Sequence, residues 1–365
     1  MTQKVTETIR HLNQTQPWDS HRQELEVVRI LPETPDVKTF CFRTTDQSWF
    51  RYLPGQFITV ELPIEGRRVR RTYTISSSPS RPLSLTITVK AQPDSYASRW
   101  MHDHLRVGDR IKAYGPAGIF SFHNHLAPKY LFLSAGSGIT PMMSMTRWLY
   151  DFGVESDITF IHCARAPSDI IFRAEMERMA GRTDDLRLAW IVEQAEPYAA
   201  WTGYMGRLNQ LQLELIAPDY MEREIFCCGP PAFMQSVRDI LHLAGFSMEH
   251  YQEESFQAPI THESQAPTFD DDVVLEEAQD AELVFAASGA SVRCRQTDTV
   301  LSVAREAGIV VPSACQFGVC GTCRLRKLDG EVHMVHNGGI SDEDIAEGYI
   351  LACCSHPLGK VTLDY

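Results

Sequence analysis

The sequence lacks several features that would place it in a large class of proteins. No run of about 20 apolar residues occurs in the 365 positions, which argues against a membrane-spanning helix. The N-terminal stretch MTQKVTETIRHLNQ has no apolar core of the kind found in secretory signals, so we expect a cytoplasmic protein. Basic residues are in the minority, with 34 Lys and Arg against 47 Asp and Glu, and the formal net charge of −13 argues against a nucleic-acid partner.

One segment is devoid of basic residues. No Lys or Arg occurs between Gln257 and Val292, and the stretch APITHESQAPTFDDDVVLEEAQDAE is rich in Pro, Asp and Glu. This composition predicts a solvated linker, with docking of a partner as the alternative. A chain of 365 residues has room for two to three domains. We therefore expect a polar extension over 1–24, domains over 25–124 and 125–256, a linker over 257–280 and a third domain over 281–365.

The first two predicted domains differ in the rhythm of their apolar residues. Six short runs between 25 and 124, such as VKTFCFRT (37–44) and FITVEL (57–62), alternate polar and apolar positions and predict an antiparallel barrel. Between 125 and 256, strand-like and helix-like runs alternate, as in DITFIHCA (157–164) followed by DIIFRAEMERMAG (169–181). This second rhythm predicts a parallel sheet covered by helices. In the third domain, ELVFAASGASVRCRQ (282–296) predicts a hairpin that turns at Ser288–Gly289, and TVLSVAREAG (299–308) predicts a helix capped by Gly308.

Ten cysteines occur in the chain, and in a reducing compartment they are not expected to form a disulfide framework. Three lie close together in SACQFGVCGTC (313–323), and a fourth lies far downstream in ILACCSHP. A Cys-x4-Cys-x2-Cys spacing with a distant fourth cysteine is the plant-type [2Fe–2S] arrangement. The predicted cluster ligands are Cys315, Cys320, Cys323 and Cys353.

A zinc site is the alternative for these cysteines. It can be drawn from CGTC together with Cys353 and His356, but it leaves Cys315 unused. It also does not account for Gly318 and Gly321, which would let backbone N–H groups approach cluster sulfurs and adopt positive φ at little cost. The cluster is therefore the favoured interpretation, with the neighbouring Cys354 and the more distant Cys294 expected to be small buried residues.

The stretch RRTYTISSSP (70–79) closes one of the predicted barrel strands. It places a cation (Arg71), an aromatic ring (Tyr73) and a hydroxyl (Thr74) close together. These groups suit a phosphate, an isoalloxazine ring and a flavin nitrogen respectively, although a plain strand edge would also explain them.

Two stretches of the second domain suit a nucleotide. In AGSGITP (135–141), Gly136 and Gly138 would let the backbone approach a cofactor, and Thr140 at the helix start would favour an anion. A ligand-free turn is the alternative for this loop. CCGPPAFM (227–234) resembles the Cys-Gly-Pro motif of flavin reductases, which implies that Cys228 lies near a nicotinamide ring; a buried structural cysteine is the alternative.

In their order along the chain, these motifs resemble those of ferredoxin–NADP reductase-like flavoproteins fused to a plant-type ferredoxin domain of β-grasp fold. ACQFGVCGTC and LACC match the ferredoxin pattern in all four ligands and both glycines, and EESF (253–256) matches a Glu-x-Phe at the flavin edge. PDSYAS (93–98) matches a phosphate loop at Ser98, with Ser95 where a glycine is usual. The resemblance implies FAD, with FMN as the alternative, and it places Thr74 and Cys228 at the hydride-transfer centre. The cofactor-binding residues that it implies are Arg71, Tyr73, Thr74, Ser76, Ser98, Gly136, Gly138, Thr140, Pro141, Cys228, Gly229, Pro230, Glu254 and Phe256.

The choice between NADH and NADPH depends on the charges that follow the second strand of the nucleotide domain. HCARAPSD (162–169) offers Arg165, which could bind a 2′-phosphate, but also Asp169, which would repel one. We therefore expect NADH.

A flavin that takes a hydride from NADH and a cluster that carries single electrons together imply an electron-transfer reductase. No pair of Glu-x-x-His motifs for a di-iron site occurs, so we expect oxygen to be activated by a separate polypeptide. FIHCARAPSDIIF (160–172) and HNGGISDEDIAEGYILACCS (336–355) resemble the reductase subunits of glycine betaine demethylases. In those systems the partner is a Rieske monooxygenase, and the N-methyl group is lost as formaldehyde. The partner is expected to dock around Gln316, Phe317 and Val319, with packing of Phe317 and Val319 on the loop itself as the alternative.

Two other functions stay open at this point. The chain could be a reductase for a different partner, such as a hybrid cluster protein or another di-iron or Rieske oxygenase. It could also be a binding module whose ferredoxin domain serves only for docking. Consumption of oxygen and a methylated amine in the presence of a partner would distinguish the demethylase reductase from both.

Overall fold

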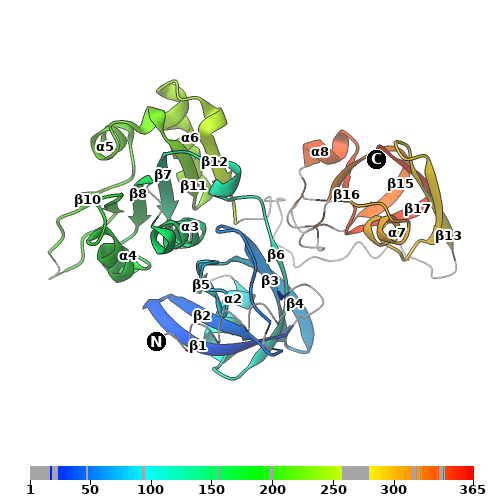
Figure 1. Cartoon of the computed structure of the whole chain (residues 1–365), viewed down its shortest axis with the longest axis horizontal. Coiled ribbons are helices and arrows are strands. Elements are labelled where there is room, and N and C mark those ends of the chain that lie inside the picture. Colours follow the sequence, from blue (N-terminus) through cyan, green and yellow to red (C-terminus); the bar gives the residue numbers. More distant parts are fainter. Residues whose placement is uncertain are drawn as a thin grey trace. The chain divides into compact units, whose positions relative to one another are not determined.

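The computed structural model describes residues 17–18, 24–46, 48–92, 95–153, 156–197, 200–256, 279–311, 313, 318, 321, 323–334, 336, 340 and 342–365. The chain divides into two compact units between Phe256 and Gln257. Figure 1 traces both along the sequence. The predicted N-terminal extension and acidic linker lie almost wholly outside the described residues. None of the described helices combines the length and the hydropathy that a bilayer crossing requires.

The first unit opens with an antiparallel barrel, as predicted. Its strands lie in the order β4-β3-β6-β1-β2-β5. An antiparallel bridge between Ile75 and Ile87 then joins the end of β4 to β5 and closes the sheet on itself. Side chains alternate between the barrel interior and its outer face. Phe40 and Phe42 of β2 are fully buried, whereas Arg43 of the same strand is exposed. The elements are β1 (Glu24–Thr34), β2 (Val37–Thr44), β3 (Phe57–Ile64), β4 (Arg67–Thr74), β5 (Leu85–Lys90), α2 (Tyr96–His104) and β6 (Arg110–Ala117).

The rest of this unit is a parallel sheet with helices on both faces, also as predicted. The strand order is β10-β9-β8-β7-β11-β12, and every neighbouring pair is parallel. The strands are β7 (Lys129–Ala135), β8 (Asp157–Ala164), β9 (Leu186–Val192), β10 (Tyr204–Met205), β11 (Glu224–Cys228) and β12 (Tyr251–Glu254). The helices are α3 (Ile139–Phe152), α4 (Arg173–Ala180), α5 (Gln210–Ile216) and α6 (Pro231–Leu243).

Each face of the sheet has its own core. Tyr130 and Phe132 of β7 pack with methionines of α3 and α4. Leu131 and Leu133, on the other face of the same strand, pack with apolar residues of α5 and α6. Because successive strand residues point to opposite faces, a nearly continuous apolar run such as YLFL is what a sheet covered on both sides requires.

One predicted helix is shorter than its sequence pattern indicates. The run 169–181 was expected to be helical, but α4 begins only at Arg173. Phe172 precedes it with φ +59°, in the left-handed region, so the helix cannot extend back through this residue. The apolar residues before it serve two different cores, since Ile170 packs with Val192 whereas Ile171 packs with the α3 and α4 residues.

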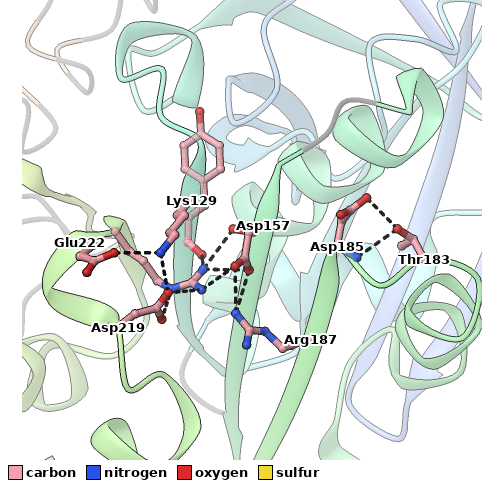
Figure 2. Close-up of polar contacts among 9 residues, drawn as sticks. Lys129, Asp157, Thr183, Asp185, Arg187, Asp219 and Glu222 are labelled. Carbon is pink, nitrogen blue, oxygen red and sulfur yellow. Dashed lines mark hydrogen bonds and ion pairs between the residues drawn. The ribbon is translucent and has the colours of Figure 1, made fainter.

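An ionic cluster ties together the amino ends of the sheet strands, at the edge opposite to the one that binds ligands in such folds. Arg223, whose side chain is 0% exposed, donates to Asp157 Oδ2 at 2.9 Å and to Asp219 Oδ1 at 2.7 Å. Lys129 at the start of β7 donates to Asp219 Oδ2 at 3.0 Å. In Figure 2, Asp157 at the start of β8 lies between this group and Arg187 of β9. These ion pairs therefore stabilise the sheet at its amino edge, away from the carboxyl edge at which the predicted nucleotide-loop residues lie.

The second unit has the topology of a β-grasp ferredoxin domain. Its sheet has the order β14-β13-β17-β15-β16, with β13 and β17 parallel and the other pairs antiparallel. The predicted hairpin turns between β13 and β14 with Gly289 at φ +68°, and the predicted helix α7 ends at Glu306, followed by Ala307 as the C-cap and by Gly308 with φ +72°. The elements are β13 (Asp280–Phe285), β14 (Ala290–Arg295), α7 (Val300–Glu306), β15 (Arg324–Met334), α8 (Asp342–Ala346), β16 (Tyr349–Leu351) and β17 (Ser355–Leu363).

Candidate functional site

The predicted flavin motif lies at the end of β4, where the barrel closes. Arg71 is exposed and donates from Nη1 to the carbonyl of Arg70 at 2.7 Å. Tyr73 is half-buried, and burial raises the pKa of its phenol to about 12, so the ring stays neutral. Ser76 has its hydroxyl within 2.8 Å of Thr86 Oγ1, so this predicted cofactor residue also closes the barrel.

Glu254, which lies 180 positions after Thr74 in the sequence, contacts this end of the barrel. Thr74 is buried, and its Oγ1 donates to Glu254 Oε2 at 3.4 Å from the end of β12. The protein packed around the Glu254 carboxyl raises its pKa to about 8, and the hydrogen bond from Thr74 only partly opposes that shift. A carboxyl group of this pKa can hold or release a proton near neutral pH. Phe256, the other residue of the predicted Glu-x-Phe pair, is 46% exposed.

The second predicted phosphate loop leads into α2. Ser95 is the N-cap of this helix, and its hydroxyl accepts from the Ser98 N–H at 3.4 Å. This capping bond gives a physical reason for a serine at a position where related loops usually have glycine. Ser98 is buried, and its hydroxyl accepts from the Gln92 N–H at 3.3 Å and donates to the Ser95 carbonyl. Ser98 therefore joins the two ends of its own loop.

The carboxyl ends of β7 and β11 meet at the predicted nucleotide loop. Gly136 has φ +53°, and a Cβ built on Gly138 would lie 2.3 Å from the Cys228 carbonyl oxygen. A Cβ on Gly229 would lie 3.0 Å from Ala135 Cβ, at the end of β7. Gly138 and Gly229 thus allow two backbones to approach more closely than side chains would permit, whereas Gly136 supplies the positive φ of the turn. Thr140 donates to the Ser137 carbonyl at 3.1 Å, and Pro141 occupies the first turn of α3, where a missing N–H has no cost.

Sheet register connects the two predicted cofactor sites. Cys228 of β11 pairs with Ser134 of β7 on one side and with Glu254 of β12 on the other. Cys228 is fully buried, and burial raises the pKa of its thiol well above the ordinary value, so it stays a neutral thiol. Pro230, which follows in the motif, is exposed. The nicotinamide-loop and flavin-edge residues therefore belong to adjacent strands of one sheet.

The predicted cluster site is described in part. Cys323 and Cys353 are 2% and 8% exposed, and the Gly318 N–H donates to Cys353 Sγ at 3.3 Å. Gly318 and Gly321 have φ +67° and +70°, the positive values for which glycine was predicted. An N–H aimed at a buried cysteine sulfur is the arrangement expected around an iron–sulfur cluster. The two described cysteines and this N–H group therefore fit the cluster.

Some of the residues predicted around the cluster lie outside the described part of the chain, and two other cysteine predictions need correction. Cys315 and Cys320, and the proposed docking residues Gln316, Phe317 and Val319, lie outside the described residues. Within the part of the chain that is described, no group of three or more His, Cys, Asp or Glu could hold a metal ion. Cys294 and Cys354 were expected to be buried, but both are half-buried. Cys294 packs against the domain core from the inward side of β14, but as an edge strand β14 leaves it only half-buried, and Cys354 lies in the loop that Gly318 approaches.

Sequence reasoning missed the contacts that join the barrel to the nucleotide domain. Arg165 donates to Asp36 Oδ2 at 3.2 Å and also pairs with Asp169 at 3.3 Å. Asp36 lies in the turn between β1 and β2, and no local pattern marks it as a neighbour of β8. On α3, Ser144 and Arg147 contact the barrel, and their polar character among buried methionines was a signal that helical periodicity could have used.

Known domain families match three parts of the chain. The oxidoreductase FAD-binding domain matches residues 24–122, the oxidoreductase NAD-binding domain matches 132–239, and the 2Fe-2S iron-sulfur cluster binding domain matches 284–358. These matches support FAD, NADH and a [2Fe–2S] cluster as the cofactors of an oxidoreductase.

Known proteins match nearly the whole length. The stachydrine N-demethylase reductase subunit Stc4 of Rhizobium meliloti is 54% identical over 345 residues, which cover 94% of this chain and 97% of that protein. The glycine betaine monooxygenase reductase subunit of Pseudomonas aeruginosa is 46% identical over 357 residues, covering 96% of this chain and 97% of that protein. Among solved structures, phthalate dioxygenase reductase aligns with a TM-score of 0.57 and 23% identity, over 94% of this chain and 97% of that one, which shows a shared fold.

Proposed function

The chain belongs to the family of FAD- and [2Fe–2S]-containing reductase subunits that includes those of stachydrine N-demethylase and glycine betaine monooxygenase, and we propose that it serves a Rieske-type monooxygenase in the N-demethylation of a betaine. As an electron-transfer oxidoreductase it works with NADH, FAD and a [2Fe–2S] cluster. The proposal is strongest for glycine betaine or a closely similar quaternary amine. The partner oxygenase binds that amine, because no motif of this chain suits it.

One observation carries the proposal. Identity of 46–54% extends over 94–96% of the chain to reductase subunits of these two N-methyl-directed systems, through all three matched domains. The partner surface of a reductase must be retained along with its cofactor sites for electrons to reach the right oxygenase. Similarity confined to cofactor motifs would not support a particular partner.

The predicted site residues are proposed to hold the three cofactors. When bound, FAD accepts a hydride from NADH and the [2Fe–2S] cluster carries single electrons onward. We assign the flavin to Arg71, Tyr73, Thr74, Ser76, Ser98, Glu254 and Phe256, the nicotinamide nucleotide to Gly136, Gly138, Thr140, Pro141, Cys228, Gly229 and Pro230, and the cluster to Cys315, Cys320, Cys323 and Cys353. The domain limits 25–124, 125–256 and 281–365 are part of this proposal.

The described residues support definite roles in this scheme. Thr74, which is buried, and Glu254, which is half-buried, form a hydroxyl–carboxyl pair that can exchange a proton at the flavin edge, since the Glu254 pKa is raised to about 8. Cys228 presents a neutral thiol, which adds bulk and no charge beside the nicotinamide loop. Arg165 is paired with Asp36 and Asp169, so its charge is not available to a 2′-phosphate, which favours NADH.

The test is formaldehyde release from glycine betaine or stachydrine with NADH, the full-length chain and a separately purified Rieske oxygenase of the demethylase type. We expect formaldehyde in proportion to the NADH consumed. Brisk NADH-driven cytochrome c reduction without formaldehyde would refute the partner and keep the reductase. A Cys323→Ser variant should lose formaldehyde release but keep ferricyanide reduction by the flavin, whereas Cys294→Ser, which changes a half-buried cysteine of β14, should keep both.

A cytoplasmic location is part of the same proposal. The cysteines assigned to the cluster must stay reduced to bind iron, and NADH is supplied inside the cell. Fractionation of cells that express the chain, with a periplasmic marker enzyme as the control, tests this location.

A further inference from the structure

One side of α3 contacts a single segment of the barrel. Ser144, Arg147 and Asp151 are spaced three and four residues apart, so they lie along one face of this helix. All three contact residues 76–81, a segment that begins just after the end of β4 and overlaps the last part of the flavin motif 70–79. We refer to these three side chains and segment 76–81 as the α3 seam.

The buried part of the α3 seam consists of hydrogen bonds to two successive carbonyl groups. Ser144 Oγ donates to the Ser77 carbonyl at 2.6 Å, and Arg147 Nη1 donates to the Ser76 carbonyl. Ser144 is 0% exposed and Arg147 is 9% exposed. Buried carbonyl groups need donors, and here a helix of the nucleotide domain supplies donors to the barrel backbone. Separating the two elements would leave these polar groups unsatisfied.

Arg147 is itself held in one orientation. Its Nε and Nη2 atoms donate to the two carboxylate oxygens of Glu175 on α4, at 2.9 and 2.7 Å, and its guanidinium lies 4.7 Å from the ring centroid of Phe172. A guanidinium with a bidentate carboxylate on one edge and a ring beneath it can direct its remaining N–H groups in only one direction. That direction is the Ser76 carbonyl.

The exposed end of the α3 seam adds an ion pair. Asp151 accepts from Arg81 Nε at 2.9 Å and Nη2 at 2.7 Å, and it also accepts from the Ser80 hydroxyl. Arg81 is 57% exposed, so this pair is solvated and contributes less than the buried contacts. The contacts of the α3 seam therefore span two turns of the helix.

Segment 76–81 is anchored to the barrel as well. Tyr52 Oη lies 2.8 Å from Ser77 Oγ, and Ser76 Oγ lies 2.9 Å from Thr88 Oγ1 on β5. The α3 seam thus joins two firmly held parts, since one side belongs to the barrel and the other to a helix that begins directly at the Gly136–Gly138 loop.

We propose that the α3 seam fixes the distance between the flavin motif and the nicotinamide loop, so that Arg147 and Ser144 are positioning residues for hydride transfer. This inference rests on the assignment of residues 71–76 to the flavin and 136–141 to NADH. An α-helix is stiff over the two turns that separate Gly138 from Arg147, so a shift at one end is transmitted to the other. Displacement of reacting groups by about 1 Å costs on the order of 10²-fold in rate.

The test compares Arg147→Met, Ser144→Ala and Arg147→Lys in the full-length, FAD-loaded chain. The matched control is Arg173→Met, which removes an exposed pair with Glu177 on α4 at 2.8 Å. Two quantities are measured by rapid mixing without oxygen: the limiting rate of flavin reduction per bound FAD and the Kd for NADH. A third readout needs no turnover: hydrogen–deuterium exchange of the amides in segment 76–81 and loop 136–140, without NADH.

We expect Arg147→Met to lower the limiting rate by at least about tenfold, with the Kd for NADH within about threefold of wild type. Exchange should rise in segment 76–81 and in the loop, Ser144→Ala should give a smaller effect in the same direction, and Arg147→Lys should recover part of the rate. The control should match wild type in every readout. If Arg147→Met does not retain FAD, Ser144→Ala and Arg147→Lys decide in the same way.

A limiting rate within about twofold of wild type in all three variants would overturn the inference, whether or not exchange rises, because the α3 seam would then only stabilise the fold. No oxygenase is used, so a wrong partner assignment cannot produce this result. Failure of the proposed reductase function would be recognised separately, because the wild-type chain itself would then not be reduced by NADH.

Discussion

Alanine at Gly138 should slow the reduction of bound flavin by NADH by about 100-fold. The backbone at this position has φ −63°, so alanine causes no conformational strain. The added Cβ, however, would lie 2.3 Å from the Cys228 carbonyl oxygen and 2.7 Å from the Gly229 nitrogen. Both are backbone atoms that cannot rotate away, so ordinary contact at about 3.5 Å requires the strand end or the loop to move by roughly 1 Å. That displacement separates the two ends that the nucleotide loop brings together.

The assay is rapid mixing of the FAD-loaded chain with NADH in the absence of oxygen, followed through the bleaching of flavin absorbance. Gly181→Ala is the matched control, because it has a right-handed backbone at φ −72° and its nearest new contact is 3.3 Å. Circular dichroism and FAD content establish that both variants are folded. A limiting rate for Gly138→Ala within about threefold of the control would refute the reasoning, because close approach of the two strand ends would then not position the nicotinamide.

Three further predictions concern charge. Packing raises the pKa of Glu254 to about 8, so its contribution to stability is present at acid pH and is lost as pH rises through about 8. In denaturant unfolding of the apoprotein from about pH 5 to 9, the free energy of unfolding of wild type should fall by a few kcal/mol more than that of Glu254→Gln. Parallel plots of this free energy against pH for the two proteins would contradict the prediction. Arg223→Met should lower the free energy of unfolding by about 1–3 kcal/mol, because it removes the donor to the Tyr130 and Asp157 carbonyls while both carboxylates keep a second cationic partner. Arg187→Met at a 52% exposed site should cost less than about 1 kcal/mol. Asp36→Asn releases one partner of Arg165 and should raise kcat/KM for NADPH relative to NADH by about tenfold; an unchanged ratio in steady-state assays would show that this arginine does not meet the 2′-position.

Local patterns were sufficient for much of the architecture. The polar–apolar alternation of VKTFCFRT became β2, and the apolar run YLFL became a strand buried on both faces, because side-chain periodicity reports directly on how many faces an element must bury. Gly308, Gly318 and Gly321 have the positive φ values predicted for them. The prediction of a helix over 169–181 was wrong up to Phe172, because the consecutive apolar residues before α4 are buried in two separate cores. Intrinsic helix propensity is a local property and does not include the packing of neighbouring residues into different cores.

The amino-acid sequence alone determined the order of barrel, parallel sheet and ferredoxin domain, together with the motifs that these carry, because periodicity, turn residues and cysteine spacing are local properties. Only the tertiary structure decided that Thr74 meets Glu254, that Gly138 lies against Cys228, and that Arg147 holds the Ser76 carbonyl. These contacts join residues up to 180 positions apart. They depend on strand register and on the packing of α3 against the barrel, which are collective results of burying two cores at once and leave no signature in any short stretch of sequence.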